Sequence, residues 1–360
     1  MRLSTFYHYA LFALAAQLAP LEGLASKMPS APPTSPSAGE GRGEGMEPVP
    51  VPRPTLRQNE RLPGPRLTLG GRLAAYYDTN VDLAPSEARF SFTPPGIGTG
   101  PIELTLDRDN QPQDSWVVSA GLNARYQLEQ THRQTQVLFG QMVLQHIDDL
   151  GATRSIVGSG YSLWRGLCRD SAFRVTGSFY YRDFGRDAVA MQLLSATYRR
   201  RIAHGSVDLR ASVAAHTFER YTPADGEKTA LTLGWNLSPS PALSCRLAAG
   251  ACSYQARAAT STYRDLFAKA ALQYQLSPQW SLFANIKLSR RDYDDVNPML
   301  ASERVETVKS GQVGLRQRLS SRDGPPWIIT HSLRFLDIQS TNSAFERQRQ
   351  VLGSELQLFF

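Results

Sequence analysis

The chain has 360 residues, of which 41% are hydrophobic and 20% are charged, and its formal net charge is +7. Its mean hydropathy of -0.32 would suit a soluble protein, but the strands of a membrane barrel are short and only half apolar, so such an average can conceal them. After residue 30, no stretch is apolar and uncharged for the roughly 20 residues that a spanning helix needs. The sequence therefore excludes a helical membrane protein.

The first 25 residues predict a secretory signal peptide. Met1 and Arg2 form a short basic start, residues 9–16 form an apolar core, and residues 23–25 are small or apolar as at a cleavage site. The alternative is a buried N-terminal helix. The polar, Pro-rich sequence that follows gives such a helix little to pack against, so we expect export.

Residues 26–63 are dominated by Pro, Gly and Ser. A segment of this composition cannot bury enough apolar surface to offset the entropy of ordering it. We therefore expect a disordered periplasmic linker between the signal peptide and the rest of the chain.

From residue 64 to the end, apolar and polar residues alternate with a period of two, as in half-buried strands. In 280–289, for example, Trp280, Leu282 and Ile286 share one face and Asn285 and Lys287 the other. About fourteen segments of this kind follow one another, with turn residues between them. They lie near 66–78, 115–129, 133–147, 153–165, 171–183, 188–201, 205–218, 227–237, 242–256, 262–276, 279–291, 304–319, 326–339 and 348–360.

These segments predict an all-β fold, a transmembrane antiparallel up-and-down β-barrel of about 14 strands over residues 64–360. Their length of 10–16 residues exceeds that of ordinary globular strands, which disfavours a soluble sandwich or propeller. The sheet must close, because in lipid an open edge leaves unpaired amides at a cost of several kcal/mol each. We expect the bacterial outer membrane as its location.

Two further features support the barrel. The longest connections, near 79–114 and 292–303, both fall on the outer side if the N-terminus is periplasmic, and short turns such as 237–241 fall on the other side. Aromatic residues mark segment ends, as in the girdles of membrane barrels. They are Tyr76, Tyr77, Trp116, Tyr126, Trp164, Tyr180, Tyr181, Trp280 and Trp327.

The last strand ends with Leu356, Leu358 and Phe360 on one face. This pattern resembles the C-terminal signal of outer-membrane barrels, which implies recognition by the barrel assembly machinery. The other expected partners are outer-membrane lipids.

Two stretches resemble a particular family. Residues 76–85, Tyr-Tyr-Asp-Thr-Asn-Val-Asp-Leu-Ala-Pro, look like the end of the first barrel strand in surface lipoprotein assembly modifiers, and residues 342–348 are similar to the approach to their last strand. The resemblance covers roughly residues 66–360. It implies translocation or surface display of a lipoprotein or another protein, with a surface lipoprotein or a periplasmic partner. Family members usually carry a periplasmic repeat domain where this chain has the Pro-rich linker.

The polar faces of the strands predict a basic lumen and a second hypothesis, a porin-like diffusion channel that prefers anions. Internal pairing of these charges, simply filling the barrel, remains the alternative. A third hypothesis is a structural or adhesive barrel that acts through its long loops. The candidate pore-lining residues are Arg72, Arg125, Arg174, Arg182, Arg210, Lys269, Lys287, Arg316, Arg318, Asp208, Asp265, Glu306 and Glu355.

No pattern predicts an enzyme, a cofactor or a metal site. The histidines of the strands and turns lie in no nucleophile motif, and no metal-ligand spacing or phosphate loop occurs. The three cysteines, Cys168, Cys245 and Cys252, suit small buried hydrophobes better than a disulfide framework. The basic residues recur along strands instead of forming one patch, so we expect no nucleic-acid binding.

Overall fold

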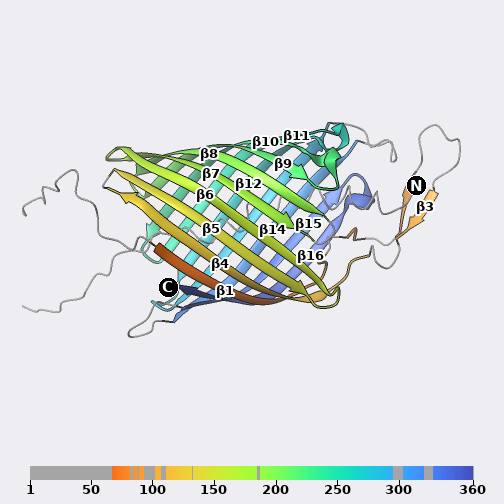
Figure 1. The fold of residues 1–360 in the computed structure, drawn as a ribbon, viewed down its shortest axis with the longest axis horizontal. Coiled ribbons are helices and arrows are strands. Elements are labelled where there is room, and N and C mark those ends of the chain that lie inside the picture. Colours follow the sequence, from red (N-terminus) through yellow and green to blue (C-terminus); the bar gives the residue numbers. More distant parts are fainter. Residues whose placement is uncertain are drawn as a thin grey trace, which may run out of the picture.

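In the computed structural model of the protein, one closed antiparallel barrel of fourteen strands accounts for nearly all of the regular structure (Figure 1). The predicted fold class is confirmed. The structure describes residues 67–81, 84–86, 89–92, 102–106, 111–131, 133–184, 187–294, 303–319 and 327–359. The predicted signal peptide, residues 1–25, and the predicted linker, residues 26–63, lie outside this part, as does Phe360.

The barrel strands follow one another in chain order, each hydrogen-bonded to the next. They are β1 (Leu67–Asp78), β4 (Ser115–Gln130), β5 (Gln134–Ile147), β6 (Ala152–Cys168), β7 (Ser171–Asp183), β8 (Ala188–Ile202), β9 (Gly205–Phe218), β10 (Gly226–Ser240), β11 (Leu243–Ala256), β12 (Tyr263–Gln275), β13 (Trp280–Tyr293), β14 (Val305–Leu319), β15 (Trp327–Ser340) and β16 (Arg347–Phe359).

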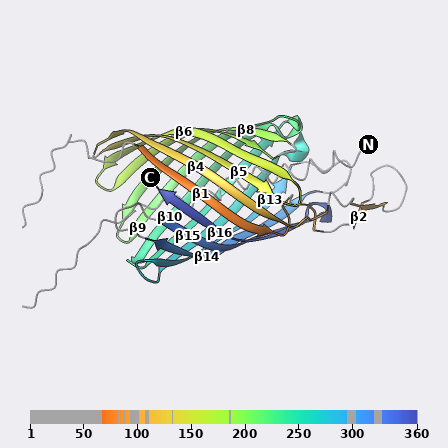
Figure 2. The ribbon, with the colours of Figure 1, turned by 60° about the horizontal axis from the view of Figure 1, so that its bottom comes forward.

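The barrel closes where β1 lies beside β16, which Figure 2 shows as orange against dark blue. Residues 70–78 of β1 pair with residues 351–359 of β16. Two ion pairs cross this junction. Arg349 Nε lies 2.9 and 3.0 Å from the Asp78 carboxylate oxygens, and Arg72 Nη1 lies 3.6 Å from Glu355 Oε2. The first and last strands are thus joined both by their backbones and by their side chains.

The two ends of the barrel differ. At one end, here called the turn end, short connections such as Cys168 to Ser171 and Ile202 to Gly205 join the strands. The other end, the loop end, carries the longer connections and three short 3₁₀ helices, η2 (Thr222–Ala224), η3 (Ala259–Ser261) and η4 (Ser343–Phe345). Beyond it lies a two-stranded sheet of β2 (Arg89–Phe92) and β3 (Ile102–Thr105) (Figure 1).

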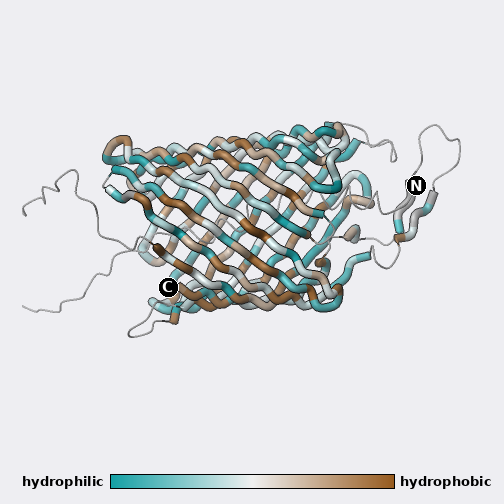
Figure 3. The backbone as a smooth tube through the Cα atoms, viewed as in Figure 1, coloured by the Kyte–Doolittle hydropathy of each residue, from teal (hydrophilic) through white to brown (hydrophobic). Residues whose placement is uncertain are grey.

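Side chains of a strand alternate between the two faces of the wall. Figure 3 shows that hydrophobic and hydrophilic residues alternate along many of the strands. Large apolar side chains on the outward face are solvent-exposed in the isolated chain, among them Leu122, Leu194, Leu266 and Leu352. Exposed apolar surface on this scale requires a covering, and on a closed barrel the acyl chains of a bilayer supply it. In the described part of the chain, no helix is long and apolar enough to cross a membrane.

The structure corrects three details. The short strands β2 and β3 were not predicted, because residues 79–114 read as one long connection. β10 runs to Ser240, beyond the predicted end near 237, with a register shift between Leu237 and Ser240.

The third correction concerns the girdle aromatics, since Tyr76, Trp164 and Tyr180 lie on the inward face. Strand alternation dictates this, because Tyr77 and Phe179 point outward beside Tyr76 and Tyr180, and Trp164 pairs with the inward Arg174. Tyr77 and Trp116 do face outward at the loop end, with ring centroids 5.7 Å apart.

Candidate functional site: the barrel lumen

All thirteen candidate pore-lining residues occupy inward-facing strand positions. Arg72, for example, alternates with the outward Leu73, and Arg174 with the outward Phe173. The remaining candidate residues also alternate with outward residues. They lie on β4, β7, β9, β12, β13, β14 and β16. The structure therefore brings these residues together around one lumen. That they line a conducting path stays a prediction.

Every acidic residue at an inward strand position of the described chain is held in an ion pair. Asp78 pairs with Arg349, Glu355 with Arg72, and Lys287 Nζ lies 3.7 Å from Asp265 Oδ2. The remaining two, Asp208 and Glu306, each bind two arginines. Because all these carboxylates are neutralised, the unbalanced charge of the lumen wall is positive.

Asp208 is a hub on β9 at the turn-end half of the lumen. Its carboxylate lies 3.6 Å from Arg199 Nη2 and 3.2 Å from Arg246 Nη2, and Asn236 Nδ2 donates to it. Asp208 is buried, whereas the side chains of Arg199 and Arg246 are 51% and 38% exposed. Since both face inward, water reaches the lumen at this level.

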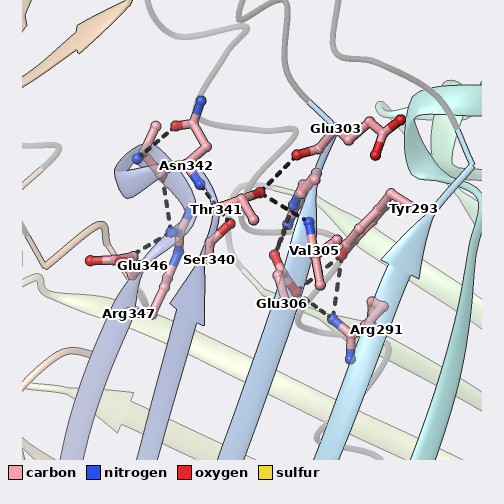
Figure 4. A network of polar contacts seen from close by, with 12 residues as sticks. Arg291, Tyr293, Glu303, Val305, Glu306, Ser340, Thr341, Asn342, Glu346 and Arg347 are labelled. Atoms are coloured by element: carbon pink, nitrogen blue, oxygen red, sulfur yellow. Dashed lines mark hydrogen bonds and ion pairs between the residues drawn. The ribbon is translucent and has the colours of Figure 1, made fainter.

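Glu306 anchors a dry cluster at the loop end (Figure 4). Arg291 Nη1 and Arg304 Nε each donate to its carboxylate at 2.8 Å, and the Tyr293 hydroxyl does so at 3.3 Å. The Arg304 guanidinium stacks between the rings of Tyr293 and Phe345, 4.0 and 3.6 Å from their centroids. This cluster fixes the starts of β14 and β16 to the end of β13.

Several basic residues of the lumen have no such partner. Within the described residues, no carboxylate lies in ion-pairing range of Arg125, Arg174, Arg210 or Lys269. Arg174 Nε donates instead to Ser162 Oγ at 2.8 Å, and Lys269 Nζ lies 4.8 Å from the centre of the Phe267 ring. The predicted alternative of complete internal pairing therefore does not hold for these four cations.

Inward aromatic rings pack over glycines of neighbouring strands. A Cβ on Gly158 would stand 2.3 Å from the Tyr180 ring, and a Cβ on Gly160 would stand 2.5 Å from the Phe139 ring. The same arrangement joins Gly250 to Phe267. Because glycine leaves room for a ring along the wall, these large side chains do not have to extend across the lumen.

Sequence reasoning missed several inward basic residues. On β8, Val189 and Met191 also face inward, so both faces look apolar and Arg199 does not stand out. On β11, the inward positions next to Arg246 in the alternation include the small residues Ala248 and Gly250. The inward face therefore does not look polar, and Arg246 is not recognised as inward. Counting alternate positions from an unambiguous outward residue would have found them. The residues missed are Arg154, Arg199, Arg201, Lys228, Arg246, Arg291, Arg334, Arg347 and Arg349.

The histidines are dispersed. His146 and His331 lie at outward positions, whereas His216 is inward and buried beside Tyr254, with ring centroids 5.6 Å apart. The described residues contain no group of three His, Cys, Asp or Glu side chains that could hold a metal ion.

Comparisons with known proteins show no family for this chain. No family model and no curated protein sequence matches the chain, so the resemblance to surface lipoprotein assembly modifiers rests on its two short motifs. Similar solved structures include OmpT of Vibrio cholerae, at 9% identity and TM-score 0.40 over 84% of this chain and 100% of that one. A FadL homologue of Pseudomonas aeruginosa is 10% identical, with TM-score 0.43 over 81% and 89%.

A third similar structure, a bacterial polysaccharide outer-membrane secretin, is 12% identical, with TM-score 0.45 over 81% of this chain and 98% of that one. The barrel's own features decide its class. They are an even number of antiparallel strands, full closure, an apolar outward face, and turns at one end with loops at the other. The chain is an outer-membrane β-barrel.

Proposed function

We propose that the protein is a diffusion channel of the outer membrane that prefers anions. One observation carries the proposal. The inward carboxylates of the described strands are all neutralised in ion pairs, while Arg125, Arg174, Arg210 and Lys269 are not. A wall with unbalanced positive charge attracts anions and repels cations.

Access of water supports the same proposal. Arg125 and Arg210 face the lumen and are exposed to solvent, as is Arg334 on β15. A barrel interior filled by side chains, as in barrels of eight strands, would bury such groups. Fourteen strands enclose a wider lumen, and the aromatic rings that pack over glycines lie close to the wall.

The test is the reversal potential of the full chain in a planar bilayer under a KCl gradient. We expect single-channel steps with a reversal potential on the anion side. Changing Arg125, Arg174 and Arg210 together to Glu should move it toward the cation side, because three positive charges become three negative ones and the net charge along the path falls by six units. Arg200→Glu is the matched control, since Arg200 lies on the outward face of β8 and should leave the reversal potential unchanged.

A translocator is the second candidate. It is favoured by the β1–β16 junction, where the described residues pair at nine positions, fewer than at any other junction of the described barrel strands. A seam with shorter pairing is where a barrel wall would open toward the membrane for a protein cargo. The same recordings separate the two candidates. A heat-modifiable, correctly folded barrel without chloride current would contradict the channel and leave the translocator as the better account.

A further inference from the structure

Four lumen cations without a carboxylate partner in the described residues are called here the basic stripe: Arg125 on β4, Arg174 on β7, Arg210 on β9 and Lys269 on β12. In the strand order, Arg174 lies two strands from Arg210 and three from Arg125, and Lys269 lies three strands from Arg210. Like charges that face one lumen repel one another, and water in the lumen weakens this repulsion without removing it. Such an arrangement is unfavourable for the empty barrel.

The register brings two members of the stripe into line. Arg174 pairs with Thr197 on β8, and Thr197 pairs in turn with Arg210 on β9. Two strand spacings therefore separate the Arg174 and Arg210 backbones, about 10 Å. Both side chains point into the lumen, so two long guanidinium arms can converge on one small solute.

Arg174 is also held in position. Its Nε donates to Ser162 Oγ at 2.8 Å, and Ser162 Oγ lies 3.1 Å from Thr176 Oγ1. This chain of neutral hydroxyls fixes the side chain without neutralising it, and it leaves both terminal nitrogens for another partner. A purely structural arginine at this position would be expected beside a carboxylate, as Arg246 is beside Asp208.

We propose that the basic stripe is a binding site for compact multivalent oxyanions, solutes that carry two or more negative charges on phosphate or carboxylate oxygens. One such solute can neutralise two members of the stripe at once, whereas chloride can neutralise only one. Guanidinium groups suit it further, because they donate paired hydrogen bonds to these oxygens. This inference rests on the proposed channel and names its solute class.

The test is block of chloride current by pyrophosphate, with succinate in a parallel series to separate phosphate from carboxylate oxygens. In single channels of the full chain, added pyrophosphate should reduce the chloride current in a concentration-dependent way. Arg174→Gln should raise the half-blocking concentration about tenfold, the loss of one charge-assisted pair. Arg200→Gln, on the outward face, is the control and should leave it unchanged.

Thermal unfolding in detergent separates binding from structure. Arg174→Gln should keep or raise the Tm, because it relieves repulsion within the stripe, while a structural arginine would lower it. An equal half-blocking concentration for the wild type and Arg174→Gln would overturn the inference. If the folded barrel carries no chloride current, the channel proposal fails, and the stripe is then tested by the rise in Tm with pyrophosphate. Absence of that rise, or its persistence in Arg174→Gln, would overturn the stripe independently.

Discussion

Glu306 neutralises two buried guanidiniums at the loop end of the barrel. Arg291 is fully buried, and Arg304 is enclosed between two aromatic rings. Removing one partner of a buried ion pair leaves an uncompensated charge. This costs far more free energy than the intact pair contributes to stability. The cluster is thus a point where a single neutral substitution has a large effect.

We expect Glu306→Gln to lower the free energy of unfolding by about 3–5 kcal/mol, measured by guanidinium unfolding of the detergent-solubilised barrel. Glu303→Gln is the matched control, because Glu303 lies just before β14, close to Glu306 in the sequence, and is exposed; its effect should stay within about 0.5 kcal/mol. Equal effects of the two substitutions would show that the Glu306 cluster does not stabilise the fold.

At the scale of strands, glycine positions decide where rings can lie. Gly160 on β6 faces the lumen, and a Cβ there would stand 2.6 Å from the Gly177 carbonyl oxygen as well as 2.5 Å from the Phe139 ring. Gly177 on β7 faces outward, and a Cβ there would meet nothing within 4 Å. These neighbouring glycines therefore form a natural test pair.

We expect Gly160→Ala to destabilise the barrel by about 1–3 kcal/mol through overpacking, whereas Gly177→Ala should be neutral or slightly stabilising. Denaturant midpoints of the two variants measure the difference. If both alanines are tolerated equally, the ring of Phe139 is not confined to the wall.

Most strands were predictable from sequence to within a few residues, because a period of two persists over ten or more positions and the lipid requires an apolar outward face. The inward face was predictable only where it is polar. Where a strand buries apolar groups inside as well, as β8 does with Val189 against Phe218, the parity is lost and Arg199 goes unnoticed. The pairing of particular charges could not be predicted, since it depends on register between strands, and one residue of slip moves every side chain to the other face.

For the whole molecule, the two ends of the barrel define its orientation in the membrane. Barrels of this class place short turns in the periplasm and longer loops outside the cell. Ala259, exposed in η3, lies at the loop end, and the exposed Cys168 lies at the turn end. The native cysteine therefore serves as an internal marker of the periplasmic side.

We expect a membrane-impermeant maleimide to label Ala259→Cys in intact cells and to leave Cys168 unlabelled until the outer membrane is permeabilised. Mass spectrometry of the two peptides gives the labelled fraction at each site. The reverse pattern would mean that the barrel is inserted the other way round.

The junction of β1 with β16 has a consequence for the order of folding. Asp78 and Arg349, which pair across it, are 271 residues apart in the chain, whereas the other strand pairs join near neighbours in sequence. Contacts so distant along the chain form late, because the entropy of closing the intervening segment is lost before they stabilise anything. Closure of the cylinder is therefore the final, committing step of assembly. Until it occurs, both terminal strands present unpaired edges that invite pairing with other chains.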